Sequence, residues 1–326
     1  MELVTHKKLY LVSGRASRPL AEAIATELGE PLGEPNIAEF ANGEIHCRFS
    51  ESIRGCDAFI IQTHCHSGGM SINDTLMEQL IMVDAARRAS AKRITVVCPH
   101  YGYARQDRKA SGREPITAKL VANLFKEAGA SRLVGIDLHS GQIQGFFDGP
   151  VDHLTAMPVL VDRLRLLEGD LAIVSPDAGR VKVAERYANQ LDADLAIVHK
   201  RRSHTAFNTV EAKEVVGEVE GKVCVIVDDM IDTAGTICAA AEQLAERGAS
   251  RVIAATTHGV FSGPALERLS ASPIEKVIVT DTVPLPDGAD LDLIEVLSVA
   301  PIIARAIDAV FEDASVSEIF GGDNLS

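Results

Sequence analysis

The alternation of short apolar runs with helical segments constrains the fold of this chain most strongly. Runs rich in Val, Ile and Leu predict strands at 9–12, 58–62, 94–98, 133–136, 171–174, 195–198, 223–227, 252–255 and 277–279. Segments with helical periodicity lie between many of them, at 18–28, 72–89, 116–127, 157–167, 178–190, 236–246 and 300–311. Continuous apolar strands joined by helical crossovers predict an α/β protein whose parallel sheets are flanked by helices.

Two distant segments of the sequence are similar to each other. The run KEAGASRLV at 126–134 is echoed by AERGASRVI at 245–253, and in both a glycine suited to a left-handed helix C-cap precedes a strand. The separation is far too long for a solenoid repeat and favours two related α/β domains in tandem. A length of 326 residues also suits two domains of about 150 residues each. A chance similarity between two common helix–strand junctions is the alternative.

The charge balance limits the kinds of partner. With 32 basic and 46 acidic residues the formal charge is −14, which argues against nucleic acid or an anionic membrane surface as the main partner. A phosphate site in so acidic a chain needs local cations, backbone N–H groups or a divalent metal.

Several features predict a cytoplasmic location. The N-terminus leads directly into a strand-like run, so no signal peptide is expected, and no apolar stretch approaches the roughly 18 residues that span a bilayer. Six cysteines without a CxxC pair favour free thiols in a reducing compartment. The cluster His64-Cys65-His66 raises the alternative of a zinc site, but no second ligand pair at a matching spacing accompanies it, so a polar strand end is expected there.

The most informative motif follows the predicted strand 223–227. Asp228 and Asp229 come at its carboxyl end, where open α/β sheets bind ligands. A helix then begins after a loop of small and polar residues, namely Asp232, Thr233, Ala234, Gly235 and Thr236. Such a loop lets backbone N–H groups approach a phosphate, and the acids can accept hydrogen bonds from a vicinal diol, so the motif predicts a ribose phosphate site. The alternative is an ordinary N-cap after an acidic turn, which this density of acids and threonines disfavours.

Three further segments place cations or a histidine at predicted strand ends. PHYGYARQDRK at 99–109 concentrates positive charges that could grip a polyphosphate. HKRR at 199–202, followed by polar residues to 205, predicts a mobile basic loop, and IDLHSGQIQGFF at 136–147 contains His139. Taken singly, each has a simpler alternative, which is a solvated basic loop for the first two and a structural histidine for the third.

Together, in this order and spacing, these segments resemble the ribose-phosphate pyrophosphokinase (phosphoribosyl pyrophosphate synthetase) family from about residue 8 to residue 320. The motif at 228–236 alone resembles the loop of type I phosphoribosyltransferases; the 99–109 and 199–202 segments separate the two families. No Walker A or GxGxxG motif is present. The resemblance implies two tandem phosphoribosyltransferase-like domains, 1–150 and 151–300, with the C-terminal segment 301–326 joined to the first.

The resemblance implies an enzyme that transfers the pyrophosphoryl group of ATP to the 1-hydroxyl of ribose 5-phosphate, with Mg²⁺ as cofactor. It places ribose 5-phosphate on 228–236, and Lys200 and Arg202 match the family's catalytic Lys and Arg. Magnesium would involve His139 and Asp177, although Mg²⁺ prefers oxygen ligands and the histidine rests on the family alone. The residues implied for ATP are Arg105, Gln106 and Asp107, with Phe40, Asn42 and Glu44 of a neighbouring subunit at the adenine.

The resemblance also implies assembly and regulation. Homodimers would assemble into a homohexamer, and phosphate and ADP would be effectors. The matching effector positions are Ser52, Arg54, Ser315, Ser317 and Phe320. Two departures from the family pattern, Arg201 between the catalytic pair and Ser140-Gly141 after His139, remove no catalytic group.

Two other functions remain as alternatives. One is a purine or pyrimidine phosphoribosyltransferase, which shares the ribose phosphate motif. The other is a catalytically silent regulatory homologue, against which the presence of Lys200, Arg202, His139 and Asp177 argues.

Overall fold

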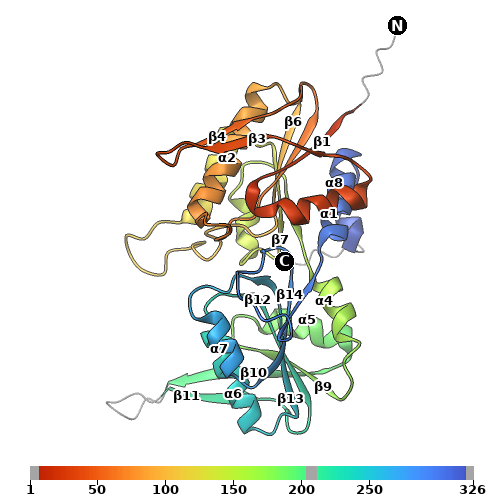
Figure 1. The fold of residues 1–326 in the computed structure, drawn as a ribbon. Helices are drawn as coiled ribbons and strands as arrows, with labels where there is room; N and C mark the ends of the chain where they lie inside the picture. The colour runs from red at the N-terminus through yellow and green to blue at the C-terminus, as the bar shows by residue number, and fades with distance from the viewer. Residues whose placement is uncertain (1–6, 203–210, 321–326) are drawn as a thin grey trace. The chain divides into compact units, whose positions relative to one another are not determined.

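The computed structural model describes residues 7–202 and 211–320, which form two compact units (Figure 1). The first unit contains the described residues up to Thr155, together with Thr282–Pro284 and those from Val299 onward. The second unit contains Ala156–Asp281 and Leu285–Ser298. No helix in the described residues is long and apolar enough to cross a membrane.

The first unit is built on a six-stranded parallel sheet with the order β2-β1-β5-β6-β7-β8. Its strands are β1 (Leu9–Ser13), β2 (Leu32–Gly33), β5 (Asp57–Ile61), β6 (Arg93–Cys98), β7 (Arg132–Ile136) and β8 (Val151–Leu154). Its helices are α1 (Arg18–Leu28), α2 (Ile72–Arg88), α3 (Thr117–Ala128) and α8 (Ala300–Phe311), with short 3-10 turns η1 (Arg15–Ser17), η2 (Gly141–Gly145) and η3 (Val316–Phe320). A separate antiparallel hairpin is formed by β3 (Asn36–Glu39) and β4 (Ile45–Arg48).

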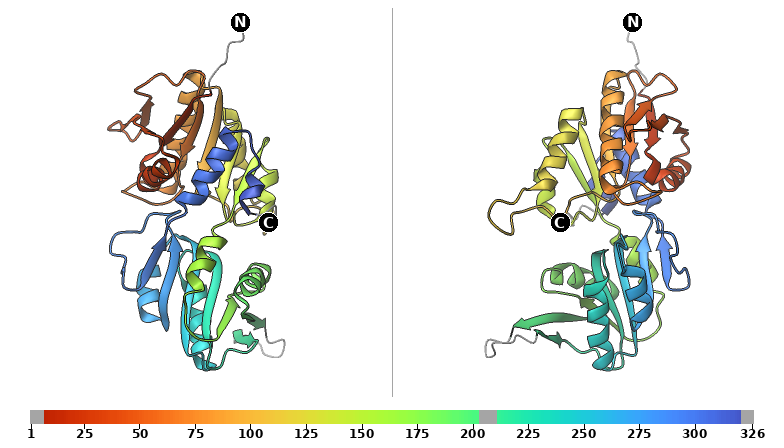
Figure 2. Two further views of the ribbon diagram at one scale, coloured as in Figure 1. Left: turned by 90° about the vertical axis from the view of Figure 1, so that its right-hand side faces the viewer. Right: turned by 60° about the vertical axis from the view of Figure 1, so that its left-hand side comes forward.

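Both faces of this sheet are buried, as continuous apolar strands predict. Tyr10 and Val96 belong to a core shared with Met82 of α2 and Phe125 of α3. Phe59, like other strand residues of the opposite parity, is equally buried, and α1 and α8 pack against each other on that second face (Figure 2).

The second unit contains a seven-stranded sheet with the order β11-β10-β9-β12-β13-β14-β15. Its strands are β9 (Leu171–Ser175), β10 (Asp194–Arg202), β11 (Glu211–Val216), β12 (Val223–Ile231), β13 (Arg251–Gly259), β14 (Ile274–Thr280) and β15 (Ile294–Leu297). All neighbours are parallel except β10 and β11. Its helices are α4 (Met157–Leu164), α5 (Val181–Leu191), α6 (Gly235–Glu246) and α7 (Ala265–Ala271). Helices α4 and α5 pack together, as do α6 and α7.

The two sheets share one topology. If the antiparallel edge strand β11 is set aside, the six strands of each sheet follow the order 2-1-3-4-5-6 in their sequence of appearance. The strand order therefore reverses between β1 and β5 in the first unit and between β9 and β12 in the second. Open α/β sheets bind ligands at such switch points.

The repeated run of the sequence forms the same local structure in the two units. In each copy a helix ends, a glycine adopts a positive φ (125° at Gly129, 82° at Gly248) and a strand begins, β7 or β13. These strands hold different positions in the shared order, since β7 is the fifth strand of its sheet and β13 is the fourth. The repeated run therefore agrees with the alternative of two common helix–strand junctions. The shared strand order of the two sheets, and not this run, relates the two units, and the predicted α/β architecture is confirmed.

Two predicted strand ends were wrong. Strand β10 continues through Arg202 instead of ending at 198, because it pairs with β11 along its whole second half, from Ile197 opposite Val216 to Arg202 opposite Glu211. Residues 200–202 are therefore strand and not the mobile loop that was predicted, while 203–205 lie outside the described residues. Strand β12 likewise continues to Ile231 because β13 pairs with it that far, so both motif acids lie within the strand.

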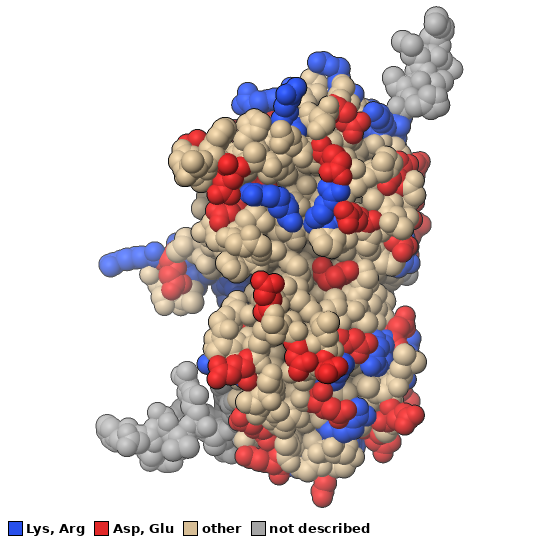
Figure 3. Space-filling view, in the orientation of Figure 1, with Lys and Arg blue, Asp and Glu red and all other residues tan. Residues whose placement is uncertain are grey.

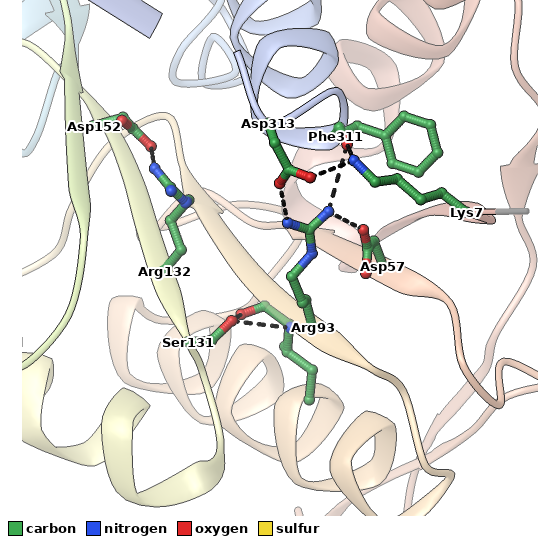
Figure 4. A network of polar contacts seen from close by, with 9 residues as sticks. Lys7, Asp57, Arg93, Ser131, Arg132, Asp152, Phe311 and Asp313 are labelled. Carbon is green, nitrogen blue, oxygen red and sulfur yellow. Dashed lines mark hydrogen bonds and ion pairs between the residues drawn. The ribbon is translucent and has the colours of Figure 1, made fainter. Parts of the chain in front are cut away.

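A polar network fixes the amino-terminal edge of the first sheet (Figure 4). Arg93, at the start of β6, forms ion pairs with Asp57 of β5 and with Asp313, just past α8. Lys7 pairs with the same Asp313 and donates to the carbonyl of Phe311 at 2.8 Å. These contacts tie the end of α8 to the starts of three neighbouring strands.

Candidate functional site

The predicted ribose phosphate motif spans the junction of β12 and α6 at the switch point of the second sheet. Asp228 and Asp229 lie late in β12 with side chains only 16% and 8% exposed. Ala234 adopts a left-handed conformation (φ 61°) and serves as the N-cap of α6 without a side-chain hydrogen bond. The first amides of a helix have no partner within it, so this N-terminus presents N–H donors suited to an anion.

Two hydrogen bonds to backbone carbonyls hold the loop between the acids and the helix in place. The amide of Ser262 donates to the carbonyl of Asp232 at 2.9 Å, and Arg268 donates to the carbonyl of Thr233 at 2.9 Å. Thr233, Gly235 and Thr236 remain exposed. The motif residues from Asp228 to Thr236 are thus gathered at one end of the sheet, as the sequence predicted.

The loop after β9 lies beside this motif, since β9 and β12 are paired neighbours. Asp177 is exposed in this loop, where its Oδ1 accepts the amide of Gly179 at 2.8 Å. Arg180 ends the loop and forms ion pairs with both motif acids, at 3.1 Å to Asp228 and 2.6 Å to Asp229. Burial, and then the charge of Asp229, raise the pKa of the Asp228 carboxyl, whereas Arg180 lowers it.

The predicted ATP segment at 99–109 begins directly after β6 in the first unit. Its first half is buried and anchored, because Tyr101 donates to the carbonyl of Ala118 at 2.8 Å. Its second half exposes Arg105, Arg108 and Lys109, whose like charges therefore gather on one loop. On the face shown in Figure 3, acidic and basic side chains are otherwise interspersed.

His139 follows β7, the strand next to β6, so it lies at the same edge of the first sheet as the 99–109 segment. Gln142 connects the two loops by donating to the Asp107 carboxylate at 2.6 Å. Gln106 accepts a hydrogen bond from Thr117 at 2.6 Å. His139 thus belongs to the first unit and Asp177 to the second.

The residues predicted at the adenine lie together on the tip of the β3–β4 hairpin. The amide of Phe40 donates to the carbonyl of Glu44 at 2.9 Å, and Asn42 accepts the amide of Glu44 at 3.2 Å. The Phe40 side chain is 57% exposed. A large aromatic ring held in solvent on a tight turn is suited to stacking against a planar ligand.

The predicted effector residues lie in two places in the first unit. Ser52 and Arg54 are exposed on the turn after β4. Ser315 and Ser317 share a hydrogen bond of 2.8 Å at the start of η3, which ends at Phe320. Within the described residues, no hydrogen bond or ion pair joins the two places.

Sequence reasoning missed two residues that shape these sites. Arg180 and Gln142 each contact a predicted site residue from a different loop. Neither carries a local signal in the sequence, since each contact depends on which strands are neighbours.

The side chains of Lys200 and Arg202 lie outside what the structure describes.

A paired-acid strand followed by an open helix N-terminus, at the switch point of a parallel sheet, is an arrangement suited to a sugar phosphate. Comparison with known proteins identifies the family more closely. The pattern of the N-terminal domain of ribose phosphate pyrophosphokinase matches residues 9–129, and that of the phosphoribosyl synthetase-associated domain matches 209–321.

Named relatives cover almost the whole chain. A ribose-phosphate pyrophosphokinase of Streptomyces avermitilis is 55% identical over 96% of this chain and 96% of its own. One of Corynebacterium glutamicum is 54% identical over 97% of each chain. The crystal structure of phosphoribosylpyrophosphate synthetase from Mycobacterium smegmatis, 50% identical, superposes with a TM-score of 0.88 over 94% of this chain and all of that one. The chain belongs to the ribose-phosphate pyrophosphokinase family, as its motifs predicted.

Proposed function

We propose that this chain is a ribose-phosphate diphosphokinase, which transfers the β,γ-pyrophosphoryl group of ATP to the 1-hydroxyl of ribose 5-phosphate and releases AMP. The observation that carries the proposal is the acid pair on β12 followed at once by the N-terminus of α6, in a member of this family. The acids suit the ribose hydroxyls and the helix N-terminus suits the 5-phosphate.

The second unit, near 151–300, binds ribose 5-phosphate through Asp228, Asp229 and the loop from Asp232 to Thr236. The first unit, near 1–150 with 301–326, binds ATP through Arg105, Gln106 and Asp107. The exposed cations beside Arg105 offset the charge of the triphosphate, which the negative net charge of the chain would otherwise repel. Lys200 and Arg202 stabilise charge on the transferring group.

Magnesium is the proposed cofactor, and the donor chemistry supports one of the two predicted ligands. Asp177 is an exposed carboxylate, the hard oxygen donor that Mg²⁺ prefers, whereas the ring nitrogens of His139 are poorer donors for it. The described residues contain no group of three or more His, Cys, Asp or Glu that could hold a metal. Phosphate oxygens and water would thus complete the shell, and the ion would offset phosphate charge.

Assembly and regulation are part of the proposal. The exposed hairpin tip with Phe40, Asn42 and Glu44 completes the adenine site of a neighbouring subunit within a homohexamer. Phosphate and ADP act at Ser52, Arg54, Ser315, Ser317 and Phe320; ADP inhibition that is purely competitive with ATP would contradict this. The six free cysteines agree with a cytoplasmic location.

A product assay tests the reaction. Incubation with ATP, ribose 5-phosphate and Mg²⁺ should yield AMP and 5-phosphoribosyl 1-pyrophosphate in equal amounts, and a chelator should stop the reaction. ADP as the nucleotide product, or turnover undiminished by the chelator, would refute the proposal.

A further inference from the structure

Arg180 contacts the candidate ribose site but has no part in the roles assigned above. Its Nε lies 3.1 Å from Oδ1 of Asp228, and its Nη2 lies 2.6 Å from Oδ1 of Asp229. The arginine side chain is itself only 17% exposed. Because both nitrogens belong to one planar guanidinium, a single side chain fixes the positions of both carboxylates.

The contact joins two loops at the switch point of the second sheet. Arg180 is the N-cap of α5 and ends the loop after β9, whereas the acids lie on β12, the neighbour of β9. The same loop carries Asp177, and Ser175 fixes its course by donating to the carbonyl of Asp177 at 2.6 Å. The guanidinium therefore links the loop of the proposed magnesium ligand to the acids of the proposed ribose site.

A physical reason for a cation at this place follows from the acids themselves. Asp228 and Asp229 are adjacent and largely buried, so their charges repel each other and lose hydration. Both effects favour a protonated carboxyl, which turns an acceptor into a donor. One guanidinium between two carboxylates offsets the repulsion and leaves the pair with a net negative charge. Such a group accepts hydrogen bonds from hydroxyls and repels a second anion.

We propose that Arg180 is a positioning residue for ribose 5-phosphate, which holds Asp228 and Asp229 as acceptors for the two vicinal hydroxyls of the ring. The inference rests on the proposed function. In this arrangement the 5-phosphate of the sugar binds to a different group, the backbone amides at the start of α6. Arg180 therefore governs recognition of the diol and not of the phosphate.

The test compares two sugars that differ in one of these hydroxyls. The kcat/KM values for ribose 5-phosphate and 2-deoxyribose 5-phosphate are measured for the unmodified enzyme, Arg180→Gln and Arg180→Lys. Arg180→Gln should lower kcat/KM for ribose 5-phosphate by roughly a hundredfold, because two hydrogen bonds to charged acceptors weaken. The loss for the deoxy sugar, which offers one donor fewer, should be much smaller, and the KM for ATP should stay unchanged. Arg180→Lys should fall between, since one ammonium cannot reproduce the fork.

Arg163→Gln provides the matched control. Arg163 makes a comparable forked pair with Glu295 in the same unit, at 2.7 and 2.9 Å, but lies outside the site. The Arg163→Gln variant should leave both kcat/KM values unchanged. Its melting temperature measures how much stability is lost with such an ion pair. Equal losses in kcat/KM for the two sugars in Arg180→Gln would overturn the inference. If Arg180→Gln does not fold, an unaltered ratio of the two kcat/KM values in Arg180→Lys would overturn it instead. An unmodified enzyme that forms no AMP with ribose 5-phosphate would refute the proposed function, and the inference with it.

Discussion

His64 is a fully buried histidine beneath the 99–109 segment. The amide of Gly102 donates to its Nδ1 at 2.9 Å, so the ring proton must sit on Nε2, which donates to Gln79 at 2.8 Å. Burial lowers the pKa of His64 to about 4, which keeps the ring neutral at physiological pH. Both ring nitrogens of His64 are thus hydrogen-bonded within the protein. The ring aligns the backbone that leads to Arg105.

Two substitutions distinguish the roles of the two ring nitrogens of His64. In His64→Asn the side-chain oxygen can still accept near the Nδ1 position, whereas in His64→Gln the amide can still donate near Nε2. We expect His64→Gln to leave the buried Gly102 amide without its acceptor and to raise the KM for ATP roughly tenfold, the equivalent of about 1.4 kcal/mol. His64→Asn should do so much less.

Hydrogen exchange of the 99–104 backbone without substrate is the independent measurement. Faster exchange in His64→Gln with an unchanged KM for ATP would show that the anchor is real but that the segment does not bind ATP. Equal exchange in both variants would contradict the role assigned to Nδ1.

Lys200 and Arg202 are proposed to act mainly as charge redistributes in the transfer. An interaction made only in the transition state lowers kcat with little effect on substrate affinity. Lys200→Ala and Arg202→Ala should each lower kcat by about a hundredfold or more, the equivalent of about 3 kcal/mol. Arg201→Ala is the matched control and should lose much less. Equal losses in kcat across the three variants would show a general positive field in place of two specific residues.

At the scale of elements, the β3–β4 hairpin is the part proposed to serve another subunit. The double variant Phe40→Ala/Glu44→Ala and the single variant Arg105→Ala should each be inactive, because one lacks the adenine contacts and the other a phosphate contact. Mixing them under conditions of subunit exchange should restore part of the activity, measured as AMP formation. Full activity of a verified monomer would contradict a shared site.

The elements that sequence reasoning found and missed differ in physical character. All nine predicted strands are present because each is a buried apolar run, as Val96 and Val225 illustrate. Six of the described strands were missed, namely β2, β3, β4, β8, β11 and β15. Most residues of β3 and β4 are exposed, and β2 has only two residues. The extent of β10 and β12 depends on the partners β11 and β13, which local sequence does not encode.

The site was also predicted only in part, where its residues are contiguous in sequence. Asp228, Asp229 and the start of α6 are contiguous in sequence, so their motif was readable. The contact between Arg180 and the acids requires two loops to meet at the switch point, and it follows only from the sheet order.

At the scale of the whole chain, an ion network links the N-terminal and C-terminal parts of the first unit (Figure 4). It consists of Lys7, Asp57, Arg93 and Asp313. Hydrogen bonds from Lys7 and Arg93 lower the pKa of the Asp313 carboxyl to about 2. A carboxyl whose pKa is depressed in the folded state stabilises that state above its unfolded pKa of about 3.9, and this contribution is lost as the pH falls toward 2.

Asp313→Asn should therefore melt at a lower temperature than the unmodified protein at pH 6. The difference should shrink between about pH 4 and pH 2, and also at high salt, because the pairs are partly exposed. Thermal unfolding across this pH range is the measurement, with Asp162→Asn, at a surface pair of α4, as the control. A difference that does not vary with pH would show that the network adds nothing through charge.

The fate of the two terminal phosphates of ATP tests the central claim most directly. ATP labelled at both the β and γ positions is incubated with ribose 5-phosphate and Mg²⁺, and the labelled products are separated. Transfer of the intact pyrophosphoryl group predicts both labels together in 5-phosphoribosyl 1-pyrophosphate and an unlabelled AMP. A γ label alone on the sugar, with the β label retained in ADP, would contradict the account.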